Sequence, residues 1–361
     1  MSRLPACFAD LKSDNSRSSA MDGVRAIAAL LVAAGHYGLI SQNANKIPVW
    51  IFFCLSGYLL SEQGLKLDFS KLTVAASFFK RRIFRLYPLY LFAIILCSIF
   101  GSPNVNEKGW HYFLTRSTFY YAEGFFWTIK QEFIFYAIMP LIILILLPLK
   151  TRPITCATVL IALAVATCSD IFSETFTVAA DQSNLKTLYF APFLTGMAGA
   201  YLQSTIFEAK AANTAAKYIM SITLYVAVAF LGYINFTIPQ GEFFHSELAI
   251  NSIIQSMPAM LAILVLLRAL PQHPISRFFS TLPLRAIGIV GYSFYMWHWP
   301  VNIILEKIYV FHGWPKLLIT GSITYIVSCF TYCLIEKPFM NFSKKTSTNA
   351  TSKSQASEIA S

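Results

Sequence analysis

The chain has 361 residues, of which 56% are hydrophobic and only 12% are charged, and its formal net charge is +11. This composition excludes an ordinary soluble globular protein, in which about a quarter of the residues are charged. The positive charge does not indicate a nucleic-acid partner, because proteins that bind nucleic acid carry their basic residues as a patch on a soluble module. We therefore expect a membrane protein with no nucleic acid among its partners.

The two ends of the chain differ in composition from its middle. Residues 1–20 are polar and rich in serine, without the apolar stretch of a signal peptide, and residues 341–361 are rich in Ser, Thr and Lys. Such compositions are typical of disorder. We expect disordered cytoplasmic tails at 1–20 and 341–361, on either side of one integral-membrane domain at 21–340.

Apolar runs follow one another through this central domain, most of them close to the roughly 20 residues that a membrane-spanning helix needs. We count about ten such runs: 24–42, 48–62, 84–101, 126–148, 154–171, 187–204, 215–236, 247–268, 285–306 and 315–335. The predicted fold class is an all-α integral membrane protein with about ten transmembrane helices.

The placement of lysine and arginine orients these helices. With the N-terminus on the cytoplasmic side, twenty of these residues fall on cytoplasmic stretches and six on outer stretches. Basic residues are enriched in the cytoplasmic loops of membrane proteins. Because the number of spans is even, the sequence predicts that both termini are cytoplasmic.

The first apolar run carries two ionisable residues, Arg25 near its start and His36 eleven residues later. Eleven residues at about 100° each return to within about 20° of the same helix face, roughly 16 Å further along the axis. Ionisable groups are costly inside a bilayer and are candidates for function. The pair therefore marks a polar stripe along the first helix.

Three titratable residues from three different runs share one depth. His36, Glu132 and His298 each lie about 9–12 Å below the outer surface, counted at about 1.5 Å per residue from the helix ends. They predict a shared polar chamber suited to general acid–base chemistry. Structural roles are the alternative, with His36 a satisfied buried histidine, His298 part of an aromatic belt, and Glu132 paired with Lys130 or a histidine.

A basic cluster opens the third run at the cytoplasmic surface, with Arg82 and Arg85 as its central members. It serves as a positive-inside anchor on lipid headgroups. Arginine forks also bind phosphate oxygens in pairs, so Arg82 and Arg85, together with Arg25, are candidates for a phosphate clamp. The seven cysteines include no CxxC pair, and we interpret them as small apolar core residues rather than as disulfides or metal ligands. No metal site is expected.

Six motifs occur in one order along residues 21–340, and together they resemble the acyltransferase-3 family of bacterial membrane O-acyltransferases. They are Met21-Asp22-Gly23-Val24-Arg25 with His36; Phe52-Phe53-Cys54-Leu55-Ser56-Gly57-Tyr58; Arg82 and Arg85 followed by Tyr87-Pro88; Trp127-Thr128 through Glu132 to Phe135-Tyr136 and Pro140; Tyr292 through His298 to Pro300; and Glu336-Lys337-Pro338-Phe339. The chain departs from the family in having Phe133 where a second carboxylate is common, so only Glu132 carries over.

The resemblance implies a multi-pass enzyme of the bacterial cytoplasmic (inner) membrane. It would move an acyl group, most commonly acetyl, from cytoplasmic acyl-CoA to a hydroxyl of an extracytoplasmic glycan such as O-antigen, capsule or exopolysaccharide. Arg25, Arg82 and Arg85 would bind the donor. His36, Glu132 and His298 would be catalytic, with His36 as general base or as carrier of the acyl group. The implied partners are acyl-CoA, a lipid-linked or nascent glycan and membrane lipids, with acetyl-CoA as a substrate and no permanently bound cofactor.

Two other classes fit part of the pattern. Many spans around a polar chamber also suit a transporter or flippase for a glycan or small molecule, although no paired discontinuous helices are evident. His36 and His298 could instead ligate a membrane haem. An acyltransferase consumes its donor, a transporter produces flux without consuming one, and a haem protein shows a Soret band.

Overall fold

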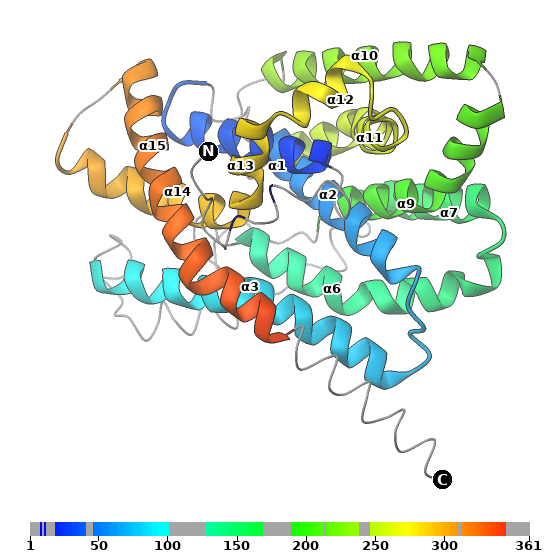
Figure 1. The fold of residues 1–361 in the computed structure, drawn as a ribbon, viewed down its shortest axis with the longest axis horizontal. Helices are drawn as coiled ribbons and strands as arrows, with labels where there is room; N and C mark the ends of the chain where they lie inside the picture. The colour runs from blue at the N-terminus through cyan, green and yellow to red at the C-terminus, as the bar shows by residue number, and fades with distance from the viewer. Residues whose placement is uncertain are drawn as a thin grey trace, which may run out of the picture.

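The computed structural model describes Phe8, Leu11 and residues 19–40, 46–100, 127–168, 189–212, 214–237, 246–309 and 312–343. Every regular element in these ranges is helical, which confirms the all-α prediction for this part of the chain. The long helices α3, α6, α9 and α10 run roughly parallel to one another, while α15 crosses them at a steep angle (Figure 1).

The helices follow the chain in this order: α1 Ser19–His36, α2 Lys46–Gly64, α3 Leu72–Phe100, α6 Trp127–Leu146, α7 Pro153–Ala166, α9 Phe190–Ala212, α10 Thr214–Thr237, α11 Ser246–Ala269, α12 Pro274–Phe279, α13 Leu282–Ile289, α14 Gly291–Glu306 and α15 Gly313–Thr331. A short 3-10 turn, Leu147–Leu149, extends α6, and a π-helical turn, Tyr332–Glu336, continues α15.

Each of the ten predicted apolar runs overlaps one or more of these helices. Four helical segments among the described residues are long and apolar enough to cross a membrane: Trp127–Leu149, Thr214–Thr237, Ile250–Ala269 and Gly313–Ser343; Pro153–Ala166 is apolar but shorter. The structure thus supports a multi-pass membrane protein, while the number of ten spans and the orientation of the ends stay predictions. The run 285–306 is not one helix, because the chain breaks at Val290 between α13 and α14.

Close approach of two backbones at glycines brings α2 and α9 together. A Cβ added to Gly196 would lie 1.9 Å from the carbonyl oxygen of Cys54, and one added to Gly57 would lie 2.1 Å from that of Phe193. Small residues at such crossings let membrane helices pack backbone against backbone. The same contact fixes which residues of α2 face away from α9.

Aromatic stacking attaches α6 to this pair of helices. The ring of Phe193 on α9 lies between Phe53 of α2 and Phe135 of α6, with centroid distances of 4.4 Å on both sides. All three side chains are buried. The stack sets the position of α6 against α2, and with it the approach of Glu132 to Ser56.

A second pair of glycine contacts joins α1 to the elements that precede α14. A Cβ on Gly288 of α13 would lie 1.9 Å from the carbonyl oxygen of Asp22, and a Cβ on Gly23 would lie 1.9 Å from that of Phe279 on α12. These contacts hold the start of α1, where Arg25 lies, against the start of α14.

Polar contacts between buried groups tie α15 and its π-helical turn to α14 and α1. Ser293 Oγ of α14 donates to Glu336 Oε2 at 2.9 Å, and Trp297 Nε1 donates to Thr331 Oγ1 at 3.0 Å. The Tyr37 hydroxyl lies 3.0 Å from Thr324 Oγ1. π-helical turns inside α-helices are frequent at functional sites, and this one carries the buried carboxylate of Glu336.

The predicted tails, 1–20 and 341–361, lie mostly outside the described residues. Of the first tail, Phe8 and Leu11 are described and pack in a cluster with Tyr332, and Ser19–Ala20 begin α1. Residues 341–343 continue the last helix. Cys54, Cys97, Cys156, Cys168 and Cys329 are free. Cys333 is disulfide-bonded, so for this residue the prediction of a plain apolar cysteine is wrong.

Candidate active site

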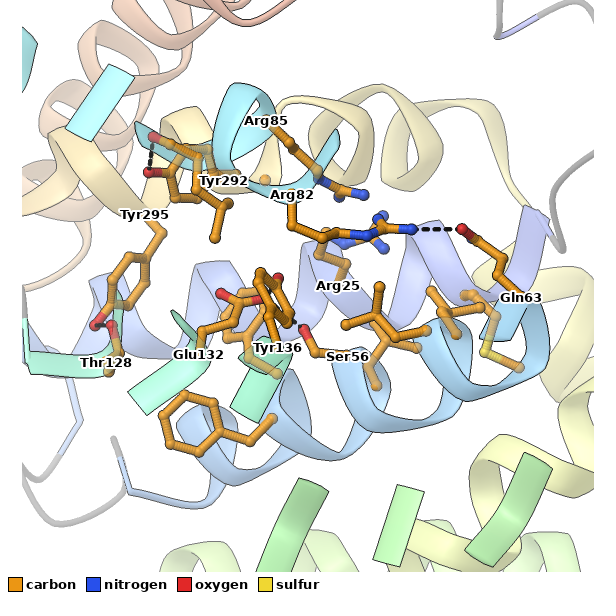
Figure 2. Close-up of a pocket in the computed structure, with 18 of the residues that line it drawn as sticks. Arg25, Ser56, Gln63, Arg82, Arg85, Thr128, Glu132, Tyr136, Tyr292 and Tyr295 are labelled. Atoms are coloured by element: carbon orange, nitrogen blue, oxygen red, sulfur yellow. Dashed lines mark hydrogen bonds between the residues drawn. The ribbon is translucent and has the colours of Figure 1, made fainter. Parts of the chain in front are cut away.

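A cavity of about 260 Å³ lies between α1, α2, α3, α6 and α14 (Figure 2). We call it the basic cavity. Its charged and polar lining residues are Asp22, Arg25, Ser56, Glu62, Gln63, Lys66, Arg82, Arg85, Thr128, Glu132, Tyr136, Arg268, Tyr292 and Tyr295. The cavity therefore contains all three arginines that were predicted from the sequence to bind phosphate. Glu132, which was predicted to lie with the two histidines, lines the same cavity.

Two of these arginines come from one face of α3. Arg82 and Arg85 are three residues apart, the spacing that places side chains on the same side of a helix. Arg82 Nη2 donates to Gln63 Oε1 at 2.6 Å, and its guanidinium lies 5.1 Å from the centre of the Phe78 ring. Its Nε has no partner in the part of the chain that the structure describes. Both guanidinium groups reach the cavity (Figure 2).

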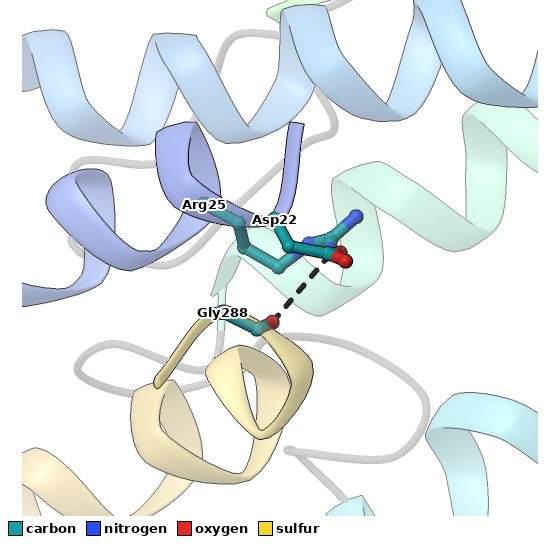
Figure 3. Close-up of polar contacts among 3 residues, drawn as sticks. All are labelled: Asp22, Arg25 and Gly288. Carbon is teal, nitrogen blue, oxygen red and sulfur yellow. Dashed lines mark hydrogen bonds and ion pairs between the residues drawn. The ribbon is translucent and has the colours of Figure 1, made fainter. Parts of the chain in front are cut away.

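The third arginine enters from α1 and is fixed at its guanidinium end (Figure 3). Arg25 Nη1 donates to Asp22 Oδ1 at 2.7 Å and lies 3.5 Å from the carbonyl oxygen of Gly288. A Cβ on Gly291 would lie 2.9 Å from Arg25 Cδ, so the glycine at the start of α14 leaves room for the arginine stem. The guanidinium is thereby held beside those of α3.

A tyrosine keeps α3 and α14 in register at the cavity. The Tyr292 hydroxyl donates to the carbonyl oxygen of Leu86 at 2.7 Å, one residue after Arg85. This bond fixes the turn of α3 that carries the arginines against α14. Tyr292 belongs to one of the six motifs, but no role was predicted for it from the sequence.

Glu132 is bound by two hydroxyl groups in the cavity. Ser56 Oγ of α2 donates to Glu132 Oε1 at 2.9 Å, and the Tyr136 hydroxyl, one turn further along α6, also donates to Oε1. Glu132 hydrogen-bonds to neither histidine among the described residues. The structural alternative, in which Glu132 pairs with Lys130 or a histidine, is not what the structure shows: Glu132 belongs to a Ser56–Glu132–Tyr136 group that faces the arginines (Figure 2).

The two predicted catalytic histidines are in contact with each other. The ring centroids of His36 and His298 are 5.1 Å apart, with an angle of 44° between the planes, and Trp299 lies 4.8 Å from His36. This direct contact leaves no room for a porphyrin between the two rings. His36 is the last residue of α1. Gly38, two residues later, has φ +77°, a conformation suited to glycine just after a helix C-terminus.

A backbone carbonyl orients His298. Its Nδ1 lies 2.5 Å from the carbonyl oxygen of Tyr295, and because a carbonyl oxygen only accepts, Nδ1 is the nitrogen that carries the proton in this contact. His298 is 1% exposed. Nε2 is thus the nitrogen whose lone pair can accept a proton.

Tyr295 connects the histidine pair with the basic cavity. Its ring lies 5.2 Å from that of His298, its hydroxyl receives a hydrogen bond from Thr128 Oγ1 at 3.0 Å, and it lines the cavity. Thr128 precedes Glu132 by one turn of α6. The structure therefore does not bring His36, Glu132 and His298 into one chamber, because Glu132 lines the basic cavity and both histidines lie outside its lining, in contact with it through Tyr295.

Gln63, Tyr136, Tyr292 and Tyr295 are among the polar residues of the site for which no role was predicted from the sequence. For some of these residues, the spacing along a helix could have predicted that they lie on the same face as a residue of a motif. Gln63 is seven residues after Ser56, Tyr136 four after Glu132, and Tyr295 three before His298, so each shares a face with a residue already marked. An ion pair between Glu62 and Arg268, 2.6 Å long, lines the same cavity.

The fold and the site together define a multi-pass, all-helical membrane protein with a basic cavity beside a histidine pair. Residues 18–335 match the family model described as an acyltransferase domain, and the chain belongs to this acyltransferase-3 family. No solved structure matches the chain with significance.

Several curated proteins are similar to the chain. The peptidoglycan O-acetyltransferase OatA of Listeria monocytogenes is 24% identical over 375 residues, which cover 90% of this chain and 57% of the relative. The putative membrane-bound transacylase BcsY of Komagataeibacter xylinus is 23% identical, with coverage of 91% and 85%. The O-acetyltransferase OatA of Staphylococcus aureus is 22% identical, with coverage of 88% and 56%. The chain thus spans little more than half the length of the OatA proteins.

Proposed function

We propose that this chain is a membrane O-acyltransferase that moves an acyl group, in the first instance acetyl, from cytoplasmic acyl-CoA to a hydroxyl of an extracytoplasmic glycan. One observation carries the proposal. Three arginines from two helices converge on a cavity that Tyr295 joins to a pair of contacting histidines. Such a site combines a binding place for a multiply charged donor with an acid–base group.

Donor binding is assigned to Arg25, Arg82 and Arg85. Coenzyme A carries a pyrophosphate and a further phosphate, and guanidinium groups bind phosphate oxygens with two hydrogen bonds each. The partners of the arginines already present, Gln63 and Asp22, hold them in place before the donor arrives. Glu132, held by Ser56 and Tyr136, supplies a negative charge in the same cavity that balances part of their positive charge.

The chemical step is assigned to the histidine pair. The acceptor hydroxyl oxygen attacks the thioester carbonyl carbon while His36 takes the hydroxyl proton. The C–S bond then breaks, the ester is formed, and the coenzyme A thiolate leaves and recovers the proton. His298, whose Nδ1 proton is engaged by the Tyr295 carbonyl, holds the His36 ring in position through their contact. Transfer of the acyl group through a His36 acyl-imidazole is the other form of the same reaction.

The names of the relatives and the chemistry of the substrates support a proposal for the acceptor and the location. The relatives are named for O-acetyl transfer, to peptidoglycan in Listeria, and for transacylation in Komagataeibacter. We propose a surface glycan, lipid-linked or nascent, as the acceptor, and the bacterial inner membrane as the location. With both termini on the cytoplasmic side, as we also propose, the half of α3 that carries Arg82 and Arg85 would be the half nearer the soluble donor.

A histidine variant tests the chemistry. In membrane vesicles supplied with radiolabelled acetyl-CoA, His36→Ala is expected to lower label transfer to the carbohydrate fraction by about 10²- to 10⁴-fold, with coenzyme A binding unchanged. His312→Ala, at the exposed start of α15, is the matched control. Retained transfer in His36→Ala would remove the catalytic role. Glycan flux in the wild-type protein without release of free coenzyme A would favour a transporter.

A further inference from the structure

A second cavity, of about 180 Å³, lies between α1, α2, α10, α11 and α12. We call it the apolar cavity. Its lining is formed by apolar side chains such as Ile27, Ile51 and Met260, by the backbone of Gly232, and by one polar side chain, that of Asn235. It uses different faces of α1 and α2 from the basic cavity, so the same two helices form walls of both.

Asn235 is an exception to the usual pairing of buried polar groups. The residue is 6% exposed, and neither its Nδ2 nor its Oδ1 has a hydrogen-bond partner in the described part of the chain. A buried amide without partners is costly, and native proteins seldom keep one without a reason. A molecule that fills the cavity and offers a hydrogen-bonding group would remove this cost.

The depth of Asn235 indicates what kind of group this would be. The residue lies two positions before the end of α10 at Thr237, about 3 Å along the axis at a rise of about 1.5 Å per residue. A helix of 24 residues is slightly longer than the hydrocarbon core is thick. Asn235 therefore lies near the edge of the hydrocarbon, at the level where the ester groups of lipids are found.

The apolar cavity is reached from the side of the protein that faces lipid. α10 turns large apolar side chains outward, among them Ile222, Val226 and Tyr233, and Phe236 of the cavity lining is 67% exposed. A Cβ added to Gly232 would meet no atom within 4 Å. There is open space between α10 and its neighbours at this point.

We propose that the apolar cavity binds one hydrocarbon chain of a membrane glycerolipid, whose ester carbonyl accepts a hydrogen bond from Asn235 Nδ2. Oδ1 then accepts from a head-group hydroxyl or from water at the membrane surface. The lipid chain packs against the backs of α1 and α2, the helices that carry Arg25 and Ser56 on their other faces. The inference is independent of the proposed acyl transfer.

Native mass spectrometry of the detergent-purified protein, titrated with dioleoyl phosphatidylglycerol, tests this site. Gly232→Leu places a side chain in the open space and is expected to weaken the tightest lipid-binding event by about tenfold or more, because it excludes several methylene groups. Asn235→Leu keeps the volume but removes both hydrogen bonds, and is expected to weaken it roughly threefold to tenfold. Gly321→Leu is the matched control, since this glycine of α15 also has open space and lines neither cavity.

Retention of wild-type lipid affinity by either Gly232→Leu or Asn235→Leu would overturn the proposal, as would an equal loss in Gly321→Leu. A prenyl phosphate that binds more tightly than the phospholipid and displaces it would show that the occupant is of another class. Circular dichroism and gel filtration check that each variant is folded, and Gly232→Val replaces Gly232→Leu if the larger side chain prevents folding.

Discussion

The basic cavity and the apolar cavity differ in how their polar groups are satisfied. In the basic cavity Glu132 is bound by two hydroxyls, Arg82 by Gln63 and Arg25 by Asp22. In the apolar cavity the single polar side chain, Asn235, has no partner among the described residues. The first site is therefore organised before a ligand arrives, which suits recognition of a charged donor, whereas the second is completed by the molecule it binds.

The largest effect in this comparison is expected for an arginine of the preorganised site. Arg82→Gln removes a charged donor of hydrogen bonds to phosphate, and such bonds contribute about 1.5–3 kcal/mol. The dissociation constant of coenzyme A, measured by titration calorimetry, should rise about tenfold to a hundredfold. Lys80→Gln, two residues away and exposed, is the control. Equal small losses in the two variants would mean that the cluster only anchors the helix to headgroups.

The next effect concerns the crossing of α9 with α2, one of the two helices that form walls of both cavities. Gly196→Val would put a Cβ within 1.9 Å of the Cys54 carbonyl oxygen, whereas Gly232→Val meets open space. Overpacking typically costs about 1–3 kcal/mol, so thermal unfolding in detergent should show a clear loss for Gly196→Val and little change for Gly232→Val. Similar melting temperatures for the two variants would contradict the close α2–α9 contact.

The smallest effect is expected for one of the hydroxyls that hold Glu132. Tyr136→Phe keeps the ring and removes a single hydrogen bond, which contributes about 0.5–1.5 kcal/mol. The dissociation constant of coenzyme A should rise roughly threefold to tenfold, more than for Tyr233→Phe at the lipid-facing surface. An unchanged dissociation constant would mean that Ser56 alone is enough to position Glu132 beside the arginines.

Much of the helical framework can be predicted from the apolar runs, because a segment in a bilayer must satisfy its own backbone hydrogen bonds and does so as a helix. The stripe from Arg25 to His36 also follows from helical spacing along α1. The break at Val290 cannot be predicted from hydropathy, because α13 and α14 are both apolar. It lies between two glycines that pack closely on α1, Gly288 against Asp22 and Gly291 against Arg25.

The grouping of the site residues could be predicted only in part. The three arginines line one cavity, as expected, although Arg82 and Arg85 lie well inside α3, which begins at Leu72, and not at the start of a helix as the apolar run 84–101 predicted. The partner of Glu132 depends on the rotation of α6 against α2, which the stacking of Phe53, Phe193 and Phe135 sets. No spacing within α6 contains this information. The role of Asn235 could not be predicted for a related reason. A single asparagine in an apolar run does not indicate which groups will surround its side chain.

The π-helical turn at Tyr332–Glu336 has a consequence for comparing sequences within the family. A π turn holds one residue more than the α-helical turn it replaces. Deletion of a single residue within the turn would restore a regular helix and rotate the side chains after the deletion by about 100°. The carboxylate of Glu336 would then turn away from Ser293. A relative with a one-residue gap at this point therefore places a different residue opposite the serine of α14. The residue equivalent to Glu336 should then be identified by its contact with that serine, and not by its position in a sequence alignment.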